Sequence, residues 1–596
     1  MNFLRFLPFL DLRNYDTAQA RADLVAAITV TFTSVPQAIA YAMIAGLPPA
    51  MGLYAASYPT IVGSLFRSSS HVVAGPSNAL SLLVGAGLGV LITDGNPATA
   101  AVTLAVMVGV FQILAGFLRL GVIVDFISSS VVLGYITGAG ILIAIGQLPN
   151  LTKTIGARGD VLHRISVWSQ GLGKLHMLSL AVGLATAALI VLMRKFLKKL
   201  PGPIIVLSLA TAATMLLGLH EQGLKVVKDI KSIEAALPPL TLPDLSMLQK
   251  LLPLAVAATV LSLVESSAVA RAIAARTKQR LDISVEFAGQ GWANLAAGFS
   301  GGYPVSGSLS RSAINHQSGA RSRLAGVFGG VMMLVVLLAL GPVVNYTPIA
   351  ALAGLLMVVA WDLVNRTRIA ITMRSTWADR ITFVATVLGT WSLSLDQAIY
   401  LGVALSLVFF LRQARLLTIN ELAIDKDGEL HQLGPNADED TPFPRCHSCR
   451  ILQLEGHLFF GVEGELRQAL DEVALDPKIK VLILRMKRTK GMDITVANVL
   501  QEAAEQYASQ GRTLILTGVS PATMAILKET GVLETFRPEH VIGMQARWFD
   551  ALELSIREAC KLLEEAGCEE ECPIREFCRT HPFREDRSVT LPSSTN

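Results

Sequence analysis

The sequence predicts a polytopic α-helical membrane protein with a soluble α/β domain near its C-terminal end. Hydrophobic residues make up 52% of the 596 residues and charged residues only 16%, against roughly 25% charged in soluble proteins. Charged and polar residues return after about residue 415, where the apolar runs become short and strand-like. Five earlier stretches contain no Asp, Glu, Lys or Arg and have the roughly 18 or more residues that a membrane helix needs: Leu24–Phe66, Val72–Thr93, Phe126–Thr152, Leu175–Met193 and Leu324–Trp361.

Splitting the apolar runs at Gly, Pro and Asn breaks gives about fourteen candidate spans. We predict them over 23–45, 49–66, 76–93, 99–118, 121–145, 176–193, 203–219, 250–272, 285–300, 307–317, 324–341, 347–362, 380–394 and 397–412. When the first span starts in the cytoplasm, the Lys and Arg residues of the short loops fall on that side. We therefore expect an inner (plasma) membrane protein with both chain ends in the cytoplasm.

The third and tenth candidate spans are interrupted in matching ways. The third opens HVVAGPSNALSLL, with a β-like run before Gly75 and Pro76, and the tenth opens GGYPVSGSLSRSAI, with an extended stretch before Gly307. Paired interruptions of this kind indicate a binding site near the middle of a transporter. Two helix N termini meeting there would present free N–H groups to an anion, and Ser77 and Ser308 can add hydroxyls. The alternative is a pair of ordinary Gly/Pro kinks in tightly packed helices.

Two ionisable residues lie inside apolar segments, Glu265 within Leu251–Ala270 and Arg311 within Pro304–Asn315. A charge in the membrane costs about 2.5–3.5 kcal/mol, so each is a functional-site hypothesis. Arginine suits an oxyanion because it is always protonated and carries five donors. A buried carboxyl can hold a proton near neutral pH. Together they predict an anion path with a coupled proton, and the alternative is a permanent salt bridge between the two or to other groups.

The soluble region alternates strand-like and helical runs, which predicts a mixed sheet packed on helices. The predicted strands are Ile451–Leu454, Val481–Leu484 and Thr513–Leu516, and the predicted helices are Glu463–Leu475, Ile494–Ala508 and Pro521–Glu529. The expected organisation is an N-terminal segment (1–22), a transport domain (23–415), a linker (416–448), the soluble domain (449–560) and a cysteine-containing tail (561–596).

All six cysteines lie in this soluble part. A reducing cytoplasm disfavours disulfides and leaves metal binding as the usual alternative. Zinc or an iron–sulfur cluster could be held by the pair Cys446 and Cys449 with two of the three tail thiols, Cys568, Cys572 and Cys578. Free reduced thiols are the other interpretation, and no cofactor is required.

Several function classes are disfavoured. The formal net charge of +4 is small for this length, which argues against nucleic-acid binding. The sequence contains no phosphate loop, nucleotide fingerprint or HExxH motif, so we expect neither an enzyme nor a primary active transporter.

Four long motifs occur in order: VPQAIAYAMIAGLPPAMGLYAA, AGPSNALSLLVG, ESSAVAR and GGYPVSGSLSRSAINHQSGARS. With EGHLFFGVEGEL in the soluble part, the chain resembles bacterial members of the SulP family, the sulfate-permease-like anion transporters that include the motor protein prestin and carry a STAS domain. The resemblance implies fourteen spans in two inverted seven-span repeats, with the core and gate domains of uracil permeases. It also implies a homodimer that works by an elevator motion.

The resemblance also implies roles for individual residues. The substrate-binding set is Gln37, Tyr41, Ser77, Asn78, Ser308, Leu309, Ser310 and Arg311. For Gln37 and Tyr41 the alternative is hydrogen bonding between helices. Glu265 matches a family glutamate linked to proton coupling, and Ser262 stands where sodium-dependent bicarbonate members carry an aspartate, which argues against sodium. Thr495 lies where related domains are phosphorylated, but a helix N-cap is the favoured interpretation.

The expected function is therefore secondary active transport of a small anion, with sulfate the first choice and a proton as the coupled ion. An uncoupled exchanger or channel is the alternative, and bicarbonate or a four-carbon dicarboxylate the alternative substrates. A membrane-anchored signalling scaffold is a third interpretation. Expected partners are the anion, protons, the lipid bilayer, a second copy of the chain and a cytoplasmic protein that binds the STAS domain.

Overall fold

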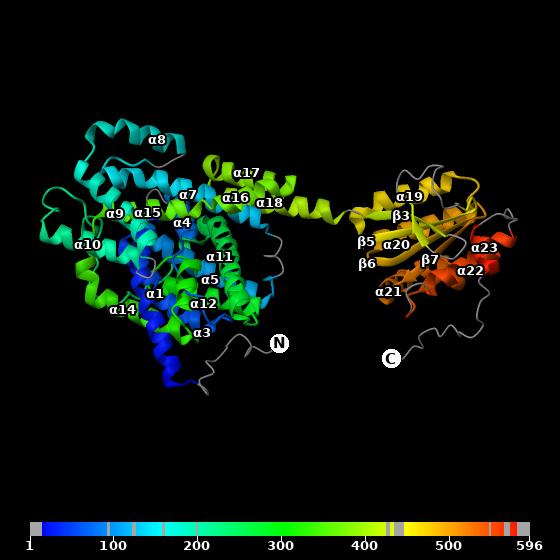
Figure 1. Ribbon diagram of the computed structural model, residues 1–596, viewed down its shortest axis with the longest axis horizontal. Helices are drawn as coiled ribbons and strands as arrows, with labels where there is room; N and C mark the ends of the chain where they lie inside the picture. The colour runs from blue at the N-terminus through cyan, green and yellow to red at the C-terminus, as the bar shows by residue number, and fades with distance from the viewer. Residues whose placement is uncertain are drawn as a thin grey trace. The chain divides into compact units, whose positions relative to one another are not determined.

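The computed structural model describes residues 15–91, 96–121, 127–157, 161–197, 201–415, 417–424, 430–433, 446–546, 550–565 and 573–580. The chain divides into two compact units, residues 1–409 and 410–596. The first unit is built from membrane-length helices and the second from a sheet with helices (Figure 1).

The membrane unit repeats one order of elements in its two halves. The first half contains α1 (Thr17–Ile44), α2 (Pro49–Ala55), α3 (Tyr58–Phe66), β1 (Ala74–Gly75), α4 (Asn78–Leu91), α5 (Pro97–Phe117), α7 (Ser129–Thr152), α8 (Val161–Gln170), α9 (Met177–Phe196) and α10 (Gly202–Leu216). The second half contains α11 (Leu248–Thr277), α12 (Ile283–Phe299), β2 (Ser306–Gly307), α13 (Leu309–Gln317), α14 (Leu324–Val344), α15 (Ile349–Leu363), α16 (Arg366–Arg374), α17 (Trp377–Ser392) and α18 (Leu395–Ala414). Each half places a two-residue strand and then a short helix, α4 or α13, after its opening helices, as expected for the predicted inverted repeat.

Each of the predicted spans overlaps a helix of the structure. Among the described residues, eight helices are long and apolar enough to cross a membrane, and α4 and α10 are shorter apolar helices. The short length of α4 follows from its start at Asn78, because β1 and Pro76 occupy the extended segment directly before it. The predicted interruption of the third span is therefore confirmed.

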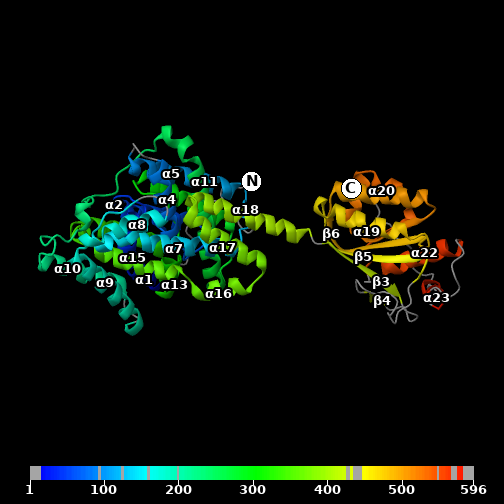
Figure 2. The same ribbon diagram turned by 90° about the horizontal axis from the view of Figure 1, so that it is seen from above.

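The helices of the membrane unit pack in two groups, shown in Figures 1 and 2. In one group α5 and α3 pack on α12, α11 packs on α5, and α14 packs on α1 and α3. In the other group α7 packs on α15 and α17, and α9 packs on α15 and α10. These two groups are the predicted core and gate domains.

Small residues bring α5 and α12 into backbone contact in the core group. A Cβ placed on Gly109 would lie 2.8 Å from the Leu295 nitrogen, and one on Gly291 would lie 2.7 Å from the Gly109 carbonyl oxygen. Close packing of this kind is how membrane helices associate, since burial away from lipid provides no hydrophobic driving force.

The soluble unit is a mixed sheet with helices on both faces. Its strands are β3 (Thr418–Ile424), β4 (Leu430–Gln432), β5 (Cys449–Leu458), β6 (Val481–Met492), β7 (Thr513–Val519) and β8 (Val541–Gly543), in the order β4-β3-β5-β6-β7-β8. Strands β5 to β8 run parallel, and β3 is antiparallel to both of its neighbours. Its helices are α19 (Glu463–Leu475), α20 (Ile494–Ser509), α21 (Pro521–Glu529), α22 (Asp550–Glu565) and α23 (Pro573–Thr580).

Alternation along β6 separates the two faces of this sheet. Leu482 and Leu484 pack in the cluster of α19, α20 and α21, whereas Val481 and Ile483 pack in the cluster of α22. Figure 2 shows α19 and α20 on one side of the sheet and α22 on the other. The predicted mixed sheet packed on helices is therefore confirmed.

Two features of the soluble unit differ from the sequence prediction. Strands β3 and β4 belong to the sheet, although the prediction assigned residues 416–448 to a linker. The run TINELAI of β3 is broken by polar residues because the strand lies near the edge of the sheet. The N-cap of α20 is Asp493, whose carboxylate accepts from the Val496 nitrogen at 3.0 Å, so the predicted Thr495 cap is wrong.

Candidate functional site

The two interrupted spans meet in the middle of the core group. Strands β1 and β2 pair antiparallel, with Ala74 opposite Gly307 and Gly75 opposite Ser306. Helices α4 and α13 begin within three residues of these strands. Their N termini, with the positive ends of both helix dipoles, therefore start from one place, as an anion site requires.

Arg311 joins the two interrupted spans. It lies on the first turn of α13, is only 3% exposed, and donates from Nη2 to the Pro76 carbonyl oxygen at 2.5 Å. Its backbone nitrogen donates to the Ser308 hydroxyl at 3.5 Å, and Ser308 is the N-cap of α13. Its Nε has no hydrogen-bond partner in the described part of the chain. The guanidinium group is thus fixed at the end of β1, and its Nε–H group is still able to donate a hydrogen bond.

Glu265 on α11 contacts the residue that follows Pro76. The Ser77 hydroxyl donates to the Glu265 carboxylate at 2.8 Å, and the Ser306 hydroxyl lies near this carboxyl. No ion pair joins Glu265 to Arg311, although both residues are described. Hydroxyl partners can serve a carboxyl in either protonation state, because a hydroxyl both donates and accepts.

The first turn of α13 is the accessible part of the site. Leu309 is 59% exposed and Ser310 is also exposed, whereas Ser308 and Ser77 are buried. Asn78 is half-buried, and its side-chain oxygen accepts from the Ala79 nitrogen. The helix end is therefore open to an incoming ligand, with the charge of Arg311 behind it.

Gln37 and Tyr41 lie on α1, which packs against both α13 and α4. The Gln37 Oε1 atom is buried and has no hydrogen-bond partner within the described ranges of the chain. Tyr41 is 6% exposed and lies within electrostatic range of Arg311 and Glu265. The structure thus brings the predicted site residues of α1, α4, α11 and α13 to one region, and their roles remain predictions.

A polar network that the sequence analysis missed holds β2 in place. The Val305 carbonyl oxygen accepts from the Ser262 hydroxyl at 3.0 Å and from the side-chain nitrogens of Gln290 and Asn294, each at 2.9 Å. Asn294 also accepts from the Val305 nitrogen at 2.7 Å, and Gln112 donates to Ser262. Ser262 is thus a support of β2. The polar side chains of Gln290 and Asn294, inside an apolar predicted span, could have indicated this network from the sequence.

A buried ion pair continues this network. Arg67 and Glu286 have fully buried side chains, with Nη1 and Oε1 3.4 Å apart, and Arg67 donates to the Gln290 Oε1 at 2.9 Å. Glu286 is a further ionisable residue within a predicted span, 285–300, in addition to the two predicted site residues. Arg67 resembled a loop cation because it follows the end of α3.

The Gly75→Ala substitution is expected to lower anion uptake at least tenfold. Gly75 has φ +152°, and an added Cβ would lie 2.2 Å from the Nη1 of Arg311. A side chain therefore strains β1 and displaces the guanidinium from the Pro76 carbonyl. Uptake into proteoliposomes and thermal unfolding measure the effect. Gly89→Ala is the control on α4, because nothing lies within 4 Å of its Cβ position, and normal uptake by Gly75→Ala would contradict the expectation.

Only some of the cysteines of the predicted metal site lie among the described residues. Cys446 and Cys449 are buried, are not in a disulfide, and lie in the same hydrophobic cluster as Cys560. Cys560 is in a disulfide, which differs from the expectation of reduced cysteines. Cys568 and Cys572, and the side chain of Cys578, lie outside the described residues, so the metal hypothesis for these thiols remains a prediction.

Paired half-helices beside a buried cation, within one of two groups of membrane-length helices, define a multi-pass membrane transporter of the inverted-repeat class. The model of the sulfate permease family matches residues 21–386, and that of the STAS domain matches residues 443–544. The chain therefore belongs to the sulfate permease family and carries a STAS domain.

Known proteins extend this assignment over most of the chain. The chain is 28% identical over 533 residues to the putative sulfate transporter YvdB of Bacillus subtilis, covering 89% of this chain and 97% of that protein. It is 27% identical over 540 residues to the probable sulfate transporter Rv1739c of Mycobacterium tuberculosis, covering 89% and 95%.

Solved structures share the fold. The structure of SLC26A9 matches with a TM-score of 0.84 at 21% identity, covering 94% of both chains. The transmembrane domain of a cyanobacterium bicarbonate transporter, BicA, matches with a TM-score of 0.57 at 24% identity, covering 66% of this chain and 97% of that one.

Proposed function

We propose that this protein is a secondary active transporter that moves sulfate together with a proton. Arg311 contacts the Pro76 carbonyl and Glu265 contacts the Ser77 hydroxyl, so the cation and the acid contact two consecutive residues directly before α4. This adjacency carries the proposal, because both charges act on the same anion-binding helix end. The relatives named as sulfate transporters support sulfate as the first substrate to test.

Proton coupling follows from electrostatics at this position. An ionised Glu265 beside the helix end repels a divalent anion, and a protonated Glu265 removes that repulsion. Binding of the proton and binding of sulfate therefore favour each other, which is the thermodynamic condition for symport. Since Glu265 is not in an ion pair with Arg311, its proton can exchange without breaking a salt bridge.

The packing supports an elevator motion. The site residues lie on α1, α4, α11 and α13, which pack mainly within the core group, with smaller contacts from α1 to α10 and α15 and from α4 to α7 of the gate group. Moving the core as one body past the gate would therefore carry the whole site across the membrane. We place both chain ends in the cytoplasm by the distribution of Lys and Arg, and we propose a homodimer whose STAS domain binds a cytoplasmic protein.

Sulfate uptake into proteoliposomes with an inward proton gradient tests the coupling. We expect the gradient to accelerate uptake severalfold in the unmodified protein and to have no effect in Glu265→Gln, which keeps the hydrogen bonds but cannot ionise. Glu234→Gln is the control, because Glu234 is an exposed carboxylate of the loop before α11.

Three other outcomes would change the assignment. Gradient-driven uptake that persists in Glu265→Gln would remove Glu265 from coupling. Sulfate uptake that ignores the gradient in the unmodified protein would favour an uncoupled exchanger or channel. Absence of sulfate uptake, with uptake of bicarbonate or fumarate instead, would replace the substrate and leave the site in place.

A further inference from the structure

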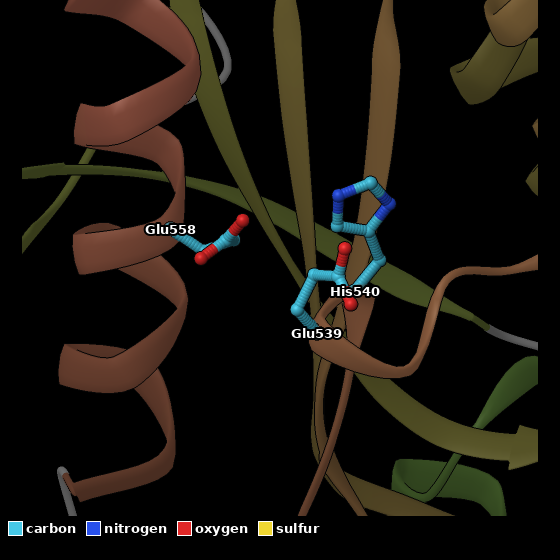
Figure 3. A group of neighbouring side chains, drawn as sticks. All are labelled: Glu539, His540 and Glu558. Atoms are coloured by element: carbon cyan, nitrogen blue, oxygen red, sulfur yellow. The ribbon is translucent and has the colours of Figure 1, made fainter.

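The soluble unit contains a cluster of three ligand-bearing side chains away from the membrane site. Glu539 and His540 lie in the 3₁₀ turn Pro538–His540 directly before β8, and Glu558 lies on α22. Their carboxylate and imidazole atoms all lie within 4.8 Å of one another. Figure 3 shows Glu558 directed from its helix toward the side chains of Glu539 and His540. Two elements separated in sequence thus bring these groups together.

His540 is the unusual member of this cluster. Its side chain is 8% exposed, and its Nε2 atom has no hydrogen-bond partner among the residues that the structure describes. A buried polar atom without a partner costs roughly 1–3 kcal/mol and requires an explanation. In Figure 3 a ring nitrogen of His540 lies on the side that faces Glu558. The unpaired nitrogen is therefore directed at a carboxylate that does not hydrogen-bond it.

The donor set selects a type of cation. One imidazole nitrogen and two carboxylates suit zinc and the neighbouring divalent transition metals, whereas magnesium and calcium prefer oxygen ligands alone. Two carboxylates with a neutral imidazole also balance the charge of a divalent ion. We propose that Glu539, His540 and Glu558 form a Zn²⁺ site in the STAS domain, with water in the remaining position.

The geometry requires only a small adjustment. Ligand atoms about 2.1 Å from zinc at tetrahedral angles lie about 3.4 Å apart, so ligand atoms that now lie within 4.8 Å of one another must approach by at most about 1.4 Å. Glu539 is exposed and can rotate to do this. Lys561 donates to Glu558 at 3.1 Å, but its side chain is 71% exposed and can turn into solvent.

A metal at this position would give α22 a second attachment to the rest of the domain. Helix α22 otherwise packs on the sheet through an apolar face that includes Leu552, Ile556 and Leu563. Zinc would add a polar link between this helix and the turn before β8. The site therefore couples zinc binding to the stability of the domain's C-terminal helix.

Titration of the metal-free, detergent-solubilised full chain with Co²⁺, followed by displacement with Zn²⁺, tests the proposal. Cobalt bound by nitrogen and oxygen shows weak visible bands without the intense thiolate charge-transfer band that cysteine ligands produce. We expect one such nitrogen- and oxygen-bound ion per chain, displaced by Zn²⁺ but not by equal Mg²⁺ or Ca²⁺. Its affinity should fall at least tenfold in His540→Ala and in Glu558→Gln.

Matched variants distinguish loss of the proposed metal site from a general effect of substitution. Glu564→Gln removes an exposed carboxylate of the same helix outside the cluster and should bind cobalt like the unmodified chain. Glu539→Gln changes an exposed residue and reports on the site if His540→Ala fails to fold. The proposal is overturned if all bound cobalt shows the thiolate band, if displacement by Mg²⁺ is equally effective, or if Glu539→Gln and Glu558→Gln bind cobalt unchanged.

Discussion

Replacing Arg311 with glutamine is expected to lower sulfate uptake by roughly 100-fold. Arg311 is buried, supplies the positive charge behind the start of α13, and fixes the Pro76 carbonyl. Losing a charge-assisted hydrogen bond in a buried site costs roughly 1.5–3 kcal/mol, and about 2.8 kcal/mol corresponds to a 100-fold change in binding. The initial rate of uptake into proteoliposomes, measured over a range of sulfate concentrations, gives this loss.

Two further variants separate charge from geometry. Arg311→Lys keeps the charge but replaces the planar guanidinium with a flexible ammonium group, so its uptake should lie between that of the unmodified protein and Arg311→Gln. Arg276→Gln removes the same charge from an exposed position on α11 and should leave uptake unchanged. Near-normal uptake by Arg311→Gln would show that the two helix ends bind the anion without this cation.

The arrangement of spans could be predicted because its signals are local. Long apolar stretches such as Leu324–Trp361 specify membrane helices by length alone. The interruption at Gly75 and Pro76 specifies an extended segment followed by a helix start, and Gly307 repeats it in the second half. The location of the site could be predicted because the two interruptions occur as a pair. Either interruption alone resembles an ordinary helix kink.

The supporting contacts could not be predicted because their partners are far apart in sequence. Glu286 accepts from the backbone nitrogens of Ser68 and Ser69, more than 200 positions earlier. Nothing near Glu286 in the sequence indicates this pairing, and a charge close to a span end resembles a loop residue. The prediction of Thr495 as the N-cap of α20 was wrong for a different reason. Asp493 and Thr495 are both good capping residues and lie two positions apart, and a helix start predicted from sequence is uncertain by that amount.

Replacing Arg67 with methionine is expected to destabilise the membrane unit by about 3–5 kcal/mol. Both members of the Arg67–Glu286 pair are fully buried, and removal of one leaves the other charge uncompensated in the protein interior. The midpoint of thermal unfolding, followed by the loss of monodisperse protein in detergent, measures this effect. Arg194→Met is the matched control, because the Arg194–Asp362 pair is about half exposed and such pairs contribute under about 1 kcal/mol.

The double variant Arg67→Met with Glu286→Gln shows whether the charge or the packing matters. It should recover part of the lost stability, since neither change leaves an unpaired charge, and the two residues are close enough to couple by roughly 0.5–3 kcal/mol. Sulfate uptake should stay impaired in the double variant. Arg67 orients Gln290, and Gln290 in turn donates to the Val305 carbonyl that positions β2. Recovered stability with fully recovered uptake would separate this ion pair from the site, because β2 would then be held by Asn294 and Ser262 alone.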